Sequence, residues 1–326
     1  MADVTKRVLV TGSTGFVGAN LVRRLLSQGH EVHLLVRPRD TRWRLQNIIS
    51  EVVLHECVLQ DAQRVTEVVT SIDPQWVFHL AAYGAYSSQR NVHDIVSTNY
   101  NGTINLVEAC LQTGFESFVN AGSSSEYGYV DHAPVETELP QPNSHYAATK
   151  VGATLYCNYA AQAHRRHIVT LRLYSVFGAW EDPTRLLPTL LVRGMRGELP
   201  PLVSPTIARD YVYIDDVTDA FLAAAQSQFN AKESVFNVGT GIQTSLAELV
   251  EMVRRQLGVV AEPEWGSMPN RQWDTDVWVS DPSAIARTLG WTATYSLAEG
   301  LVGFADWIQS DHAIRDYYET HRTPPQ

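Results

Sequence analysis

The stretch "VLVTGSTGFVGANLV" (residues 8–22) joins an apolar, β-branched run to an amphipathic run through three glycines. Gly12 would permit a tight turn, Gly15 would let backbone N–H groups approach a pyrophosphate, and Gly18 would allow a helix to pack closely on a strand. The helix N-terminus would face the phosphates with its partial positive charge. The stretch therefore predicts a strand–turn–helix unit that binds a dinucleotide. Its predicted cofactor-binding residues are Gly12, Thr14, Gly15, Phe16, Val17 and Gly18.

The end of the next apolar run, "LLVRPRD" (34–40), bears on which dinucleotide is bound. An acidic residue there would bind the ribose 2′-hydroxyl of NAD, but Val36 and Arg37 stand near that place. Arg37, helped by Arg39, would instead hold the 2′-phosphate of NADP. The run predicts NADP, with NAD possible, and the alternative for Arg37 is a solvated basic turn.

Short apolar runs and amphipathic runs alternate through the first half of the chain. The predicted strands are 7–12, 31–37, 75–82, 117–123 and 168–175, and the predicted helices are 16–29, 61–71, 93–113 and 146–165. This alternation predicts a parallel sheet with helices on both faces, the Rossmann doubly wound α/β fold.

The composition of the chain changes after about residue 175, where Pro and Gly become more frequent. Five of the eight tryptophans lie beyond residue 260. We therefore expect an NADP-binding Rossmann domain over 1–175, a smaller mixed α/β substrate lobe over 176–320, and a tail over 321–326. The run "VFNVGTG" (235–241) is expected to return to the main sheet.

The composition excludes several classes of function. The 326 residues are 44% hydrophobic and 18% charged, which is typical of a soluble globular protein. A net charge of −10 disfavours nucleic acid and anionic membranes as partners. Cysteine and histidine show no metal-ligand spacing, and the three cysteines are scattered. With no signal peptide or long apolar run recognised, we expect a cytoplasmic protein that binds no metal, nucleic acid or membrane.

Two motifs follow closely on each other, "SSSEYG" (123–128) and "HYAATK" (145–150). Tyr146 and Lys150 are four residues apart, so on a helix they share one face. A lysine charge roughly 5 Å away, at an effective dielectric constant of about 20, is worth about 3 kcal/mol, or about two pKa units. A nicotinamide cation nearby would add a similar effect, and the phenol of Tyr146 could then approach a neutral pKa and act as an acid or base. The alternative is an ordinary amphipathic helix that carries both residues.

Together, "TGSTGFVG", "HLAA" (79–82), "NYNGT" (99–103), "SSSEYG", "YAATK" and "RDYVYIDDV" (209–217) resemble the extended short-chain dehydrogenase/reductase superfamily. The resemblance is to its nucleotide-sugar epimerase and dehydratase branch and covers nearly the whole chain. It implies catalytic roles for Ser124, which would bind the reacting sugar oxygen, for Tyr146, which would move its proton, and for Lys150, which would tune Tyr146 and bind the nicotinamide ribose. Further cofactor-binding residues implied are Ala81, Ala82 and Asn99. Arg209 and Arg271 match positions that hold a nucleotide diphosphate, the alternative being surface ion pairs. The other candidate substrate-binding residues are Ser125, Arg185, Ser175, which stands where an asparagine often contacts the substrate, and Tyr83, which would shape the hexose pocket or belong to an ordinary tyrosine-rich loop.

Glu126 leaves the reaction open. In similar sugar 4,6-dehydratases a hydroxyl, a small residue and a glutamate follow one another, as do Ser124, Ser125 and Glu126, and the glutamate removes a proton from C5. A similar string also occurs in 4-keto-6-deoxyhexose reductases. A third possibility is a carboxylate that is only hydrogen-bonded in the strand-end turn. The chain also departs from the pattern, which usually has one more residue before the tyrosine of "EYG".

The leading hypothesis is hydride transfer at C4 of a nucleotide-diphosphate hexose with the cofactor recycled, as in epimerases and 4,6-dehydratases. The alternative is a reductase that consumes NADPH to reduce a nucleotide-linked 4-keto-6-deoxyhexose. A more remote alternative is an inactive NADP-sensing regulatory protein, which would not need Tyr146 and Lys150. The helices at 93–113 and 146–165 resemble those that pair in superfamily dimers, so a homodimer is expected.

Overall fold

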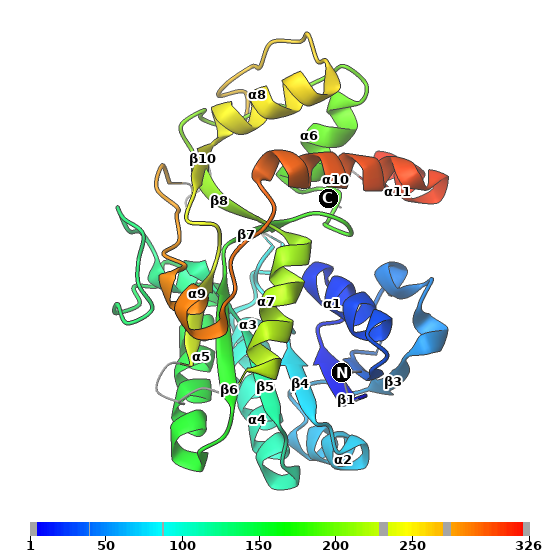
Figure 1. Cartoon of the computed structure of the whole chain (residues 1–326), viewed down its shortest axis with the longest axis vertical. Coiled ribbons are helices and arrows are strands. Elements are labelled where there is room, and N and C mark those ends of the chain that lie inside the picture. Colours follow the sequence, from blue (N-terminus) through cyan, green and yellow to red (C-terminus); the bar gives the residue numbers. More distant parts are fainter. Residues whose placement is uncertain (1–4, 39, 87, 228–233, 270–274, 322–326) are drawn as a thin grey trace.

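A seven-stranded parallel sheet forms the larger part of the protein in the computed structural model, which describes residues 5–38, 40–86, 88–227, 234–269 and 275–321 (Figure 1). Its strands, in the order β3-β2-β1-β4-β5-β6-β9, are β3 (Val53–Glu56), β2 (Glu31–Val36), β1 (Arg7–Thr11), β4 (Trp76–His79), β5 (Ser117–Ser123), β6 (Ile168–Leu173) and β9 (Val235–Val238). This order begins as 3-2-1-4-5-6, and such sheets bind ligands at the carboxyl ends of β1 and β4, where the order reverses. The predicted Rossmann fold class is confirmed.

Helices cover both faces of this sheet and bury two separate cores. One face packs against α1 (Phe16–Ser27), α7 (Ile214–Gln226) and α9 (Ser283–Leu289), and the other against α2 (Ala62–Ile72), α4 (Gly102–Thr113) and α5 (His145–His164). Residues alternate between the faces along a strand, so Val8 and Val10 enter the first core and Leu9 the second. Burial on both faces explains why the central strands are almost continuously apolar.

Short helical segments follow several strands. These are η1 (Trp43–Leu45), η2 (Ile49–Glu51), α3 (Val92–Val96), a π-helical turn η3 (Ser97–Asn101) and η4 (Ser124–Tyr127). The continuous helix predicted over 93–113 is therefore interrupted, because η3 separates α3 from α4.

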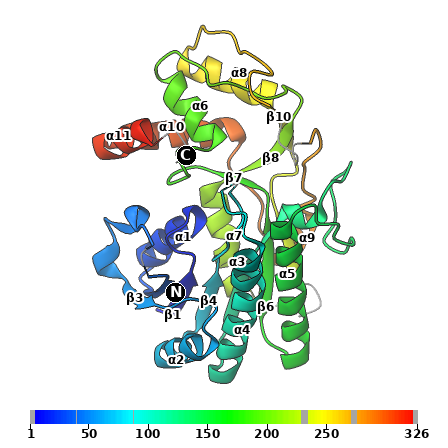
Figure 2. The ribbon, with the colours of Figure 1, turned by 180° about the vertical axis from the view of Figure 1, so that it is seen from behind.

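The smaller lobe lies beyond the carboxyl ends of the large sheet (Figures 1 and 2). A three-stranded sheet of β10 (Gln243–Ser245), β8 (Ala208–Tyr213) and β7 (Ser175–Phe177) packs with α6 (Leu186–Gly194), α8 (Leu246–Leu257), α10 (Leu297–Ser310) and α11 (His312–Thr320). Helix α8 begins with the capping box that its sequence suggests, Ser245 with Glu248. The chain leaves this lobe for the large sheet at α7, β9 and α9. Within the described ranges, no helix is both long and apolar enough to cross a membrane.

Candidate active site

The glycine turn brings the ends of β1, β4 and α1 into contact. Gly12 has a φ of +70°, and a Cβ atom there would lie 2.5 Å from the backbone nitrogen of Ala81. A Cβ atom at Gly18 would lie 2.3 Å from the carbonyl oxygen of Gly12. No side chain caps α1 and its first turn holds no acidic residue, so its partial positive charge is available to an anion. These features fit a dinucleotide with its pyrophosphate over the turn.

The other residues of this unit connect it to its surroundings. Gly15 is the N-cap of α1, and Phe16 and Val17 pack against the core of the smaller lobe. The carbonyl oxygen of Thr14 accepts a hydrogen bond from Arg44 at 3.2 Å. The turn therefore contacts both the segment after β2 and the smaller lobe.

His79 fixes the neighbouring strand end. Its Nδ1 lies 2.7 Å from the hydroxyl of Thr11, and its Nε2 lies 2.9 Å from that of Thr103. Burial lowers the pKa of His79 to about 3, so the neutral ring joins β1, β4 and α4. The N–H of Ala81 donates to the same Thr11 hydroxyl at 3.3 Å. Ala81 and Ala82 thus follow β4 at the edge of the sheet where the glycine turn lies.

Arg37 lies just past β2 and pairs with Asp40. Their guanidinium and carboxylate groups are 2.8 Å apart, and the Arg37 side chain is 54% exposed whereas that of Asp40 is 16% exposed. Asp40 also accepts a hydrogen bond of 3.5 Å from the hydroxyl of Thr14. An acidic group therefore stands between Arg37 and the glycine turn, which sequence reasoning missed. Arg39 lies outside the described residues.

Ser123, which precedes the predicted catalytic Ser124, supplies the hydroxyl that meets Tyr146. The side chains of Tyr146 and Ser123 are hydrogen-bonded, and the Ser123 hydroxyl also lies 2.7 Å from that of Ser125. Ser124 Oγ instead accepts a hydrogen bond of 3.2 Å from the indole N–H of Trp278.

The predicted lowering of the Tyr146 pKa depends on Lys150 together with a nicotinamide cation, and burial of the phenol opposes it. Burial raises the pKa of Tyr146 to about 12, although the hydrogen bond with Ser123 opposes this. Lys150 is itself buried, and burial lowers its pKa. Desolvation thus disfavours the charged form of each of the two groups. A nicotinamide cation beside the phenol would supply stabilisation of the phenolate that the protein's own groups do not.

Asn99 joins the helix that carries Tyr146 and Lys150 to the loop after β4. Its amide nitrogen donates to the hydroxyl of Thr149 at 3.0 Å and to the carbonyl oxygen of Tyr83 at 2.8 Å. Its amide oxygen accepts from the N–H of Tyr83 at 2.7 Å. The π-helical turn η3 carries Asn99, and such turns often occur at functional sites.

Glu126 is fully buried, and both oxygens of its carboxylate are engaged by other groups of the protein. One oxygen accepts from the N–H of Ser123 at 2.9 Å and from the hydroxyl of Thr154 at 3.1 Å. The other lies 2.9 Å from Nε of Arg172, whose side chain is 3% exposed. Arg172 also donates to the phenol oxygen of Tyr127 at 2.8 Å. The geometry fits the third possibility, a carboxylate held in the strand-end turn.

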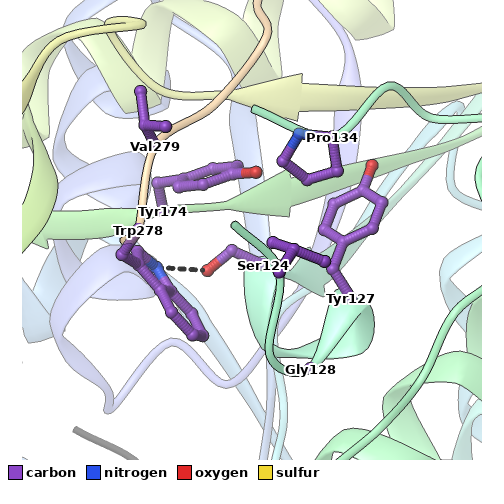
Figure 3. Close-up of a pocket in the computed structure, with 8 residues that line it drawn as sticks. Ser124, Tyr127, Gly128, Pro134, Tyr174, Trp278 and Val279 are labelled. Carbon is purple, nitrogen blue, oxygen red and sulfur yellow. Dashed lines mark hydrogen bonds between the residues drawn. The ribbon is translucent and has the colours of Figure 1, made fainter. Parts of the chain in front are cut away.

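Trp278, in the segment between α8 and α9, contacts this site. Ser124, Trp278 and Tyr174 line a cavity of about 10 Å³ together with Tyr127, Gly128, Val130, Pro134 and Val279 (Figure 3). The buried phenol oxygen of Tyr174 has no hydrogen-bond partner among the described residues. Trp278 lies 154 residues from Ser124 along the chain, among described residues that form neither helix nor strand. The sequence alone therefore gives no sign that it contacts this site.

Three of the substrate-binding residues predicted in the lobe are described by the structure: Arg185, Arg209 and Ser175. Arg185 is the N-cap of α6, lies 4.7 Å from the ring centre of Tyr86, and lowers the pKa of Tyr146 through its charge. Arg209 on β8 lies 5.3 Å from the ring centre of Trp278. Ser175 on β7 pairs with Tyr211 on β8. Arg271 lies outside the described residues.

Comparisons with known proteins agree with this arrangement. The sequence model of the "NAD dependent epimerase/dehydratase family" matches residues 8–239. A UDP-glucose 4-epimerase of Mycolicibacterium smegmatis is 32% identical over 323 residues, which cover 93% of this chain and 99% of that protein. Two solved structures are each 29% identical and cover 93% of this chain and 98% of their own. They are the UDP-glucose 4-epimerase of Thermotoga maritima with UDP-glucose, at a TM-score of 0.83, and that of Thermus thermophilus with NAD, at a TM-score of 0.81.

Proposed function

Because the chain belongs to the NAD-dependent epimerase/dehydratase family, we propose that it inverts C4 of a nucleotide-diphosphate hexose and recycles its cofactor. The observation that carries this proposal is the hydrogen-bonded pair of Ser123 and Tyr146, with Lys150 one turn further along α5. Tyr146 would take the proton of the C4 hydroxyl while Ser123 orients that oxygen. The bound nicotinamide would accept the C4 hydride and return it to the opposite face of the 4-keto sugar.

Dehydration is the less favoured reaction because the protein offers no free base at Glu126. Removal of the C5 proton needs a carboxylate that faces the sugar, whereas both oxygens of Glu126 are engaged by Ser123, Thr154 and Arg172. The neighbouring residue Ser125 cannot replace Glu126 as the base, because an alcohol is too weak a base to remove the C5 proton.

Asp40 supports NAD as the resident cofactor. A 2′-phosphate near the end of β2 would meet the Asp40 carboxylate, which is close to both Arg37 and Thr14. Like charges at such a site repel each other. NADP remains the alternative, since the Arg37 side chain is 54% exposed and a surface ion pair of this kind is weak enough to exchange Asp40 for a phosphate.

A reductase of nucleotide-linked 4-keto-6-deoxyhexoses is the second candidate, and the exposed guanidinium of Arg37 favours it. An enzyme that consumes reduced cofactor draws on NADPH, and its reaction needs Ser123 and Tyr146 but no C5 base. Inactive sensing of NADP is disfavoured because Tyr146 and Lys150 are both retained beside Ser123.

The deciding experiment combines the purified protein with UDP-hexoses and, separately, with nucleotide-linked 4-keto-6-deoxyhexoses and NADPH. The C4 epimer should form without a net change in the absorbance of reduced nicotinamide. Loss of NADPH in step with the keto sugar would instead establish the reductase. Phe in place of Tyr146 should abolish either reaction while cofactor binding survives, and unchanged turnover of Tyr146→Phe would sink both candidates.

We also propose that two copies pair through α4 and α5. Leu155 and Tyr159 on α5 are 58% and 62% exposed, and their spacing of four residues places them on one face. Tyr156 on α5 donates a hydrogen bond of 2.5 Å to Glu108 on α4, so the two helices form one surface. Exposed apolar side chains on paired helices favour association with a second such pair.

A further inference from the structure

Glu181 lies in the segment between β7 and α6, and this segment is attached to the glycine turn. Asn20 of α1 donates to the carbonyl oxygen of Ala179 at 2.8 Å. Arg44 donates to the carbonyl oxygen of Trp180 at 2.7 Å and, through another nitrogen, to that of Thr14 at 3.2 Å. The two residues before Glu181 are thus hydrogen-bonded to α1 and, through Arg44, joined to the glycine turn.

The Glu181 carboxyl is buried and lacks a partner. The residue is 7% exposed, and its Oε2 has no hydrogen-bond partner among the described residues. An orphan buried carboxyl oxygen is costly unless a ligand completes its hydrogen bonding. No ion pair of Glu181 occurs in the described ranges, although arginines stand nearby.

Charged and titratable groups of both lobes surround this carboxyl. They are Arg44 after β2, Tyr86 in the loop after β4, Asp182 beside it in the chain, Arg185 at the start of α6, Tyr211 on β8 and Tyr318 on α11. Burial raises the pKa of Glu181 to about 8, and Arg185 and Arg44 oppose this only in part. At neutral pH the group is therefore mainly a neutral acid, which can donate a hydrogen bond.

We propose that Glu181 is a ligand-binding residue whose buried carboxyl oxygen, unpartnered among the described residues, forms a hydrogen bond with a phosphate oxygen of a nucleotide diphosphate. Arg44 connects it to the glycine turn, where the dinucleotide pyrophosphate would lie. The charge of Arg185 and the phenol of Tyr211 act on it electrostatically from the lobe, where the diphosphate of the sugar nucleotide would lie. An ionised carboxylate between two such anions would repel both, whereas a neutral acid adds a donor. The inference rests on the proposed binding of these two ligands, but not on which reaction follows.

The test measures the dissociation constants of NAD⁺ and of UDP separately, by titration calorimetry from pH 6.5 to pH 9 (about the range that brackets the pKa). For the ligand that Glu181 contacts, affinity should fall about tenfold per pH unit above about pH 8, because the proton must be restored before binding. Glu181→Gln should keep the high affinity and lose this dependence, since its amide remains a donor at every pH. Glu198→Gln, an exposed site after α6, is the matched control and should behave as the wild type.

The two ligands distinguish the two sources of phosphate. A pH dependence that Glu181→Gln removes for NAD⁺ alone assigns the contact to the dinucleotide, and one removed for UDP alone assigns it to the sugar nucleotide. Identical pH profiles in wild type and Glu181→Gln would overturn the inference. Failure of the wild type to bind either ligand would instead overturn the proposed function.

A second measurement needs no variant and guards against misfolding of Glu181→Gln. Calorimetry in two buffers of different ionisation enthalpy gives the number of protons taken up on binding. The wild type should take up close to one proton per ligand above about pH 8 and almost none near pH 6.5. The absence of uptake at alkaline pH would overturn the inference.

Discussion

At the scale of single residues, two adjacent serines have different partners. Ser123 is hydrogen-bonded to Tyr146, whereas Ser124 accepts from Trp278. We expect Ser123→Ala to lower kcat by about 10²–10³-fold, the usual loss when a hydrogen bond to the reacting oxygen is removed. Ser124→Ala should act mainly on KM, because it alters the wall that Trp278 forms. Steady-state kinetics of both variants checks this, and a larger loss of kcat in Ser124→Ala would restore the role first predicted for it.

Glu126 and Arg172 form a buried ion pair, and its loss should appear in stability. Glu126→Gln leaves the Arg172 charge unpaired, which typically costs about 3–5 kcal/mol. We expect a lower Tm and a lower kcat, since the N–H of Ser123 also loses its charged acceptor.

The matched control is the double variant Glu126→Gln with Arg172→Met, which removes the unpaired charge and should recover part of the stability. Thermal unfolding and kinetics measured together distinguish the two roles of Glu126. If Glu126→Gln abolished turnover at an unchanged Tm, Glu126 would be the C5 base after all.

The sequence predicts the positions of residues that are placed by regular spacing along a helix or by a glycine pattern. It does not predict the side-chain directions of residues in the turn after β5. Spacing along one helix puts Tyr146 and Lys150 on α5, and the glycine pattern puts Gly12 at a positive φ. Which serine contacts Tyr146 depends on the residue at which η4 begins. If η4 began one residue earlier or later, the side chains of Ser123 and Ser124 would point in other directions. The direction of Glu126 depends likewise on a distant arginine on β6.

At the scale of elements, the end of β2 should govern the choice of cofactor. Wild type should bind NAD⁺ more tightly than NADP⁺ because of the Asp40 carboxylate. Asp40→Asn should raise NADP⁺ affinity about fivefold, which corresponds to roughly 1 kcal/mol for one repulsion near a protein surface. Asp219→Asn, which removes an acidic group from the ion pair with Arg24, is the control. Fluorescence titration checks both, and an unchanged preference in Asp40→Asn would reject this role.

Most central elements could be predicted because both their faces are buried. The prediction missed β3, an edge strand whose residues are only partly buried or exposed and whose sequence mixes polar and apolar types. It also joined α3 and α4 into one helix. The hydrogen bonds of Asn99 with Tyr83 and Thr149 accompany the π-helical turn there, and helical periodicity carries no sign of contacts so distant in sequence.

At the scale of the whole molecule, the exposed face of α5 should set the oligomeric state. Leu155→Glu would place a charge in the proposed contact between two copies, so the dimer should dissociate. Val260→Glu is the control, because Val260 is 88% exposed and lies just beyond α8 in the smaller lobe. Light scattering after size exclusion checks both variants. A wild type that is monomeric at micromolar concentration would refute the dimer.

The return of the chain to the large sheet has a consequence for how the protein is made. Strand β9 pairs with β6, yet more than 60 residues lie between the end of β6 at Leu173 and the start of β9 at Val235. During synthesis the edge of β6 therefore stays without its neighbour until the first part of the smaller lobe has left the ribosome. An uncovered strand edge is prone to pair with other chains. Rescue by chaperones that hold nascent chains should therefore matter more for this protein than its finished sheet, in which β6 is paired on both sides, would suggest.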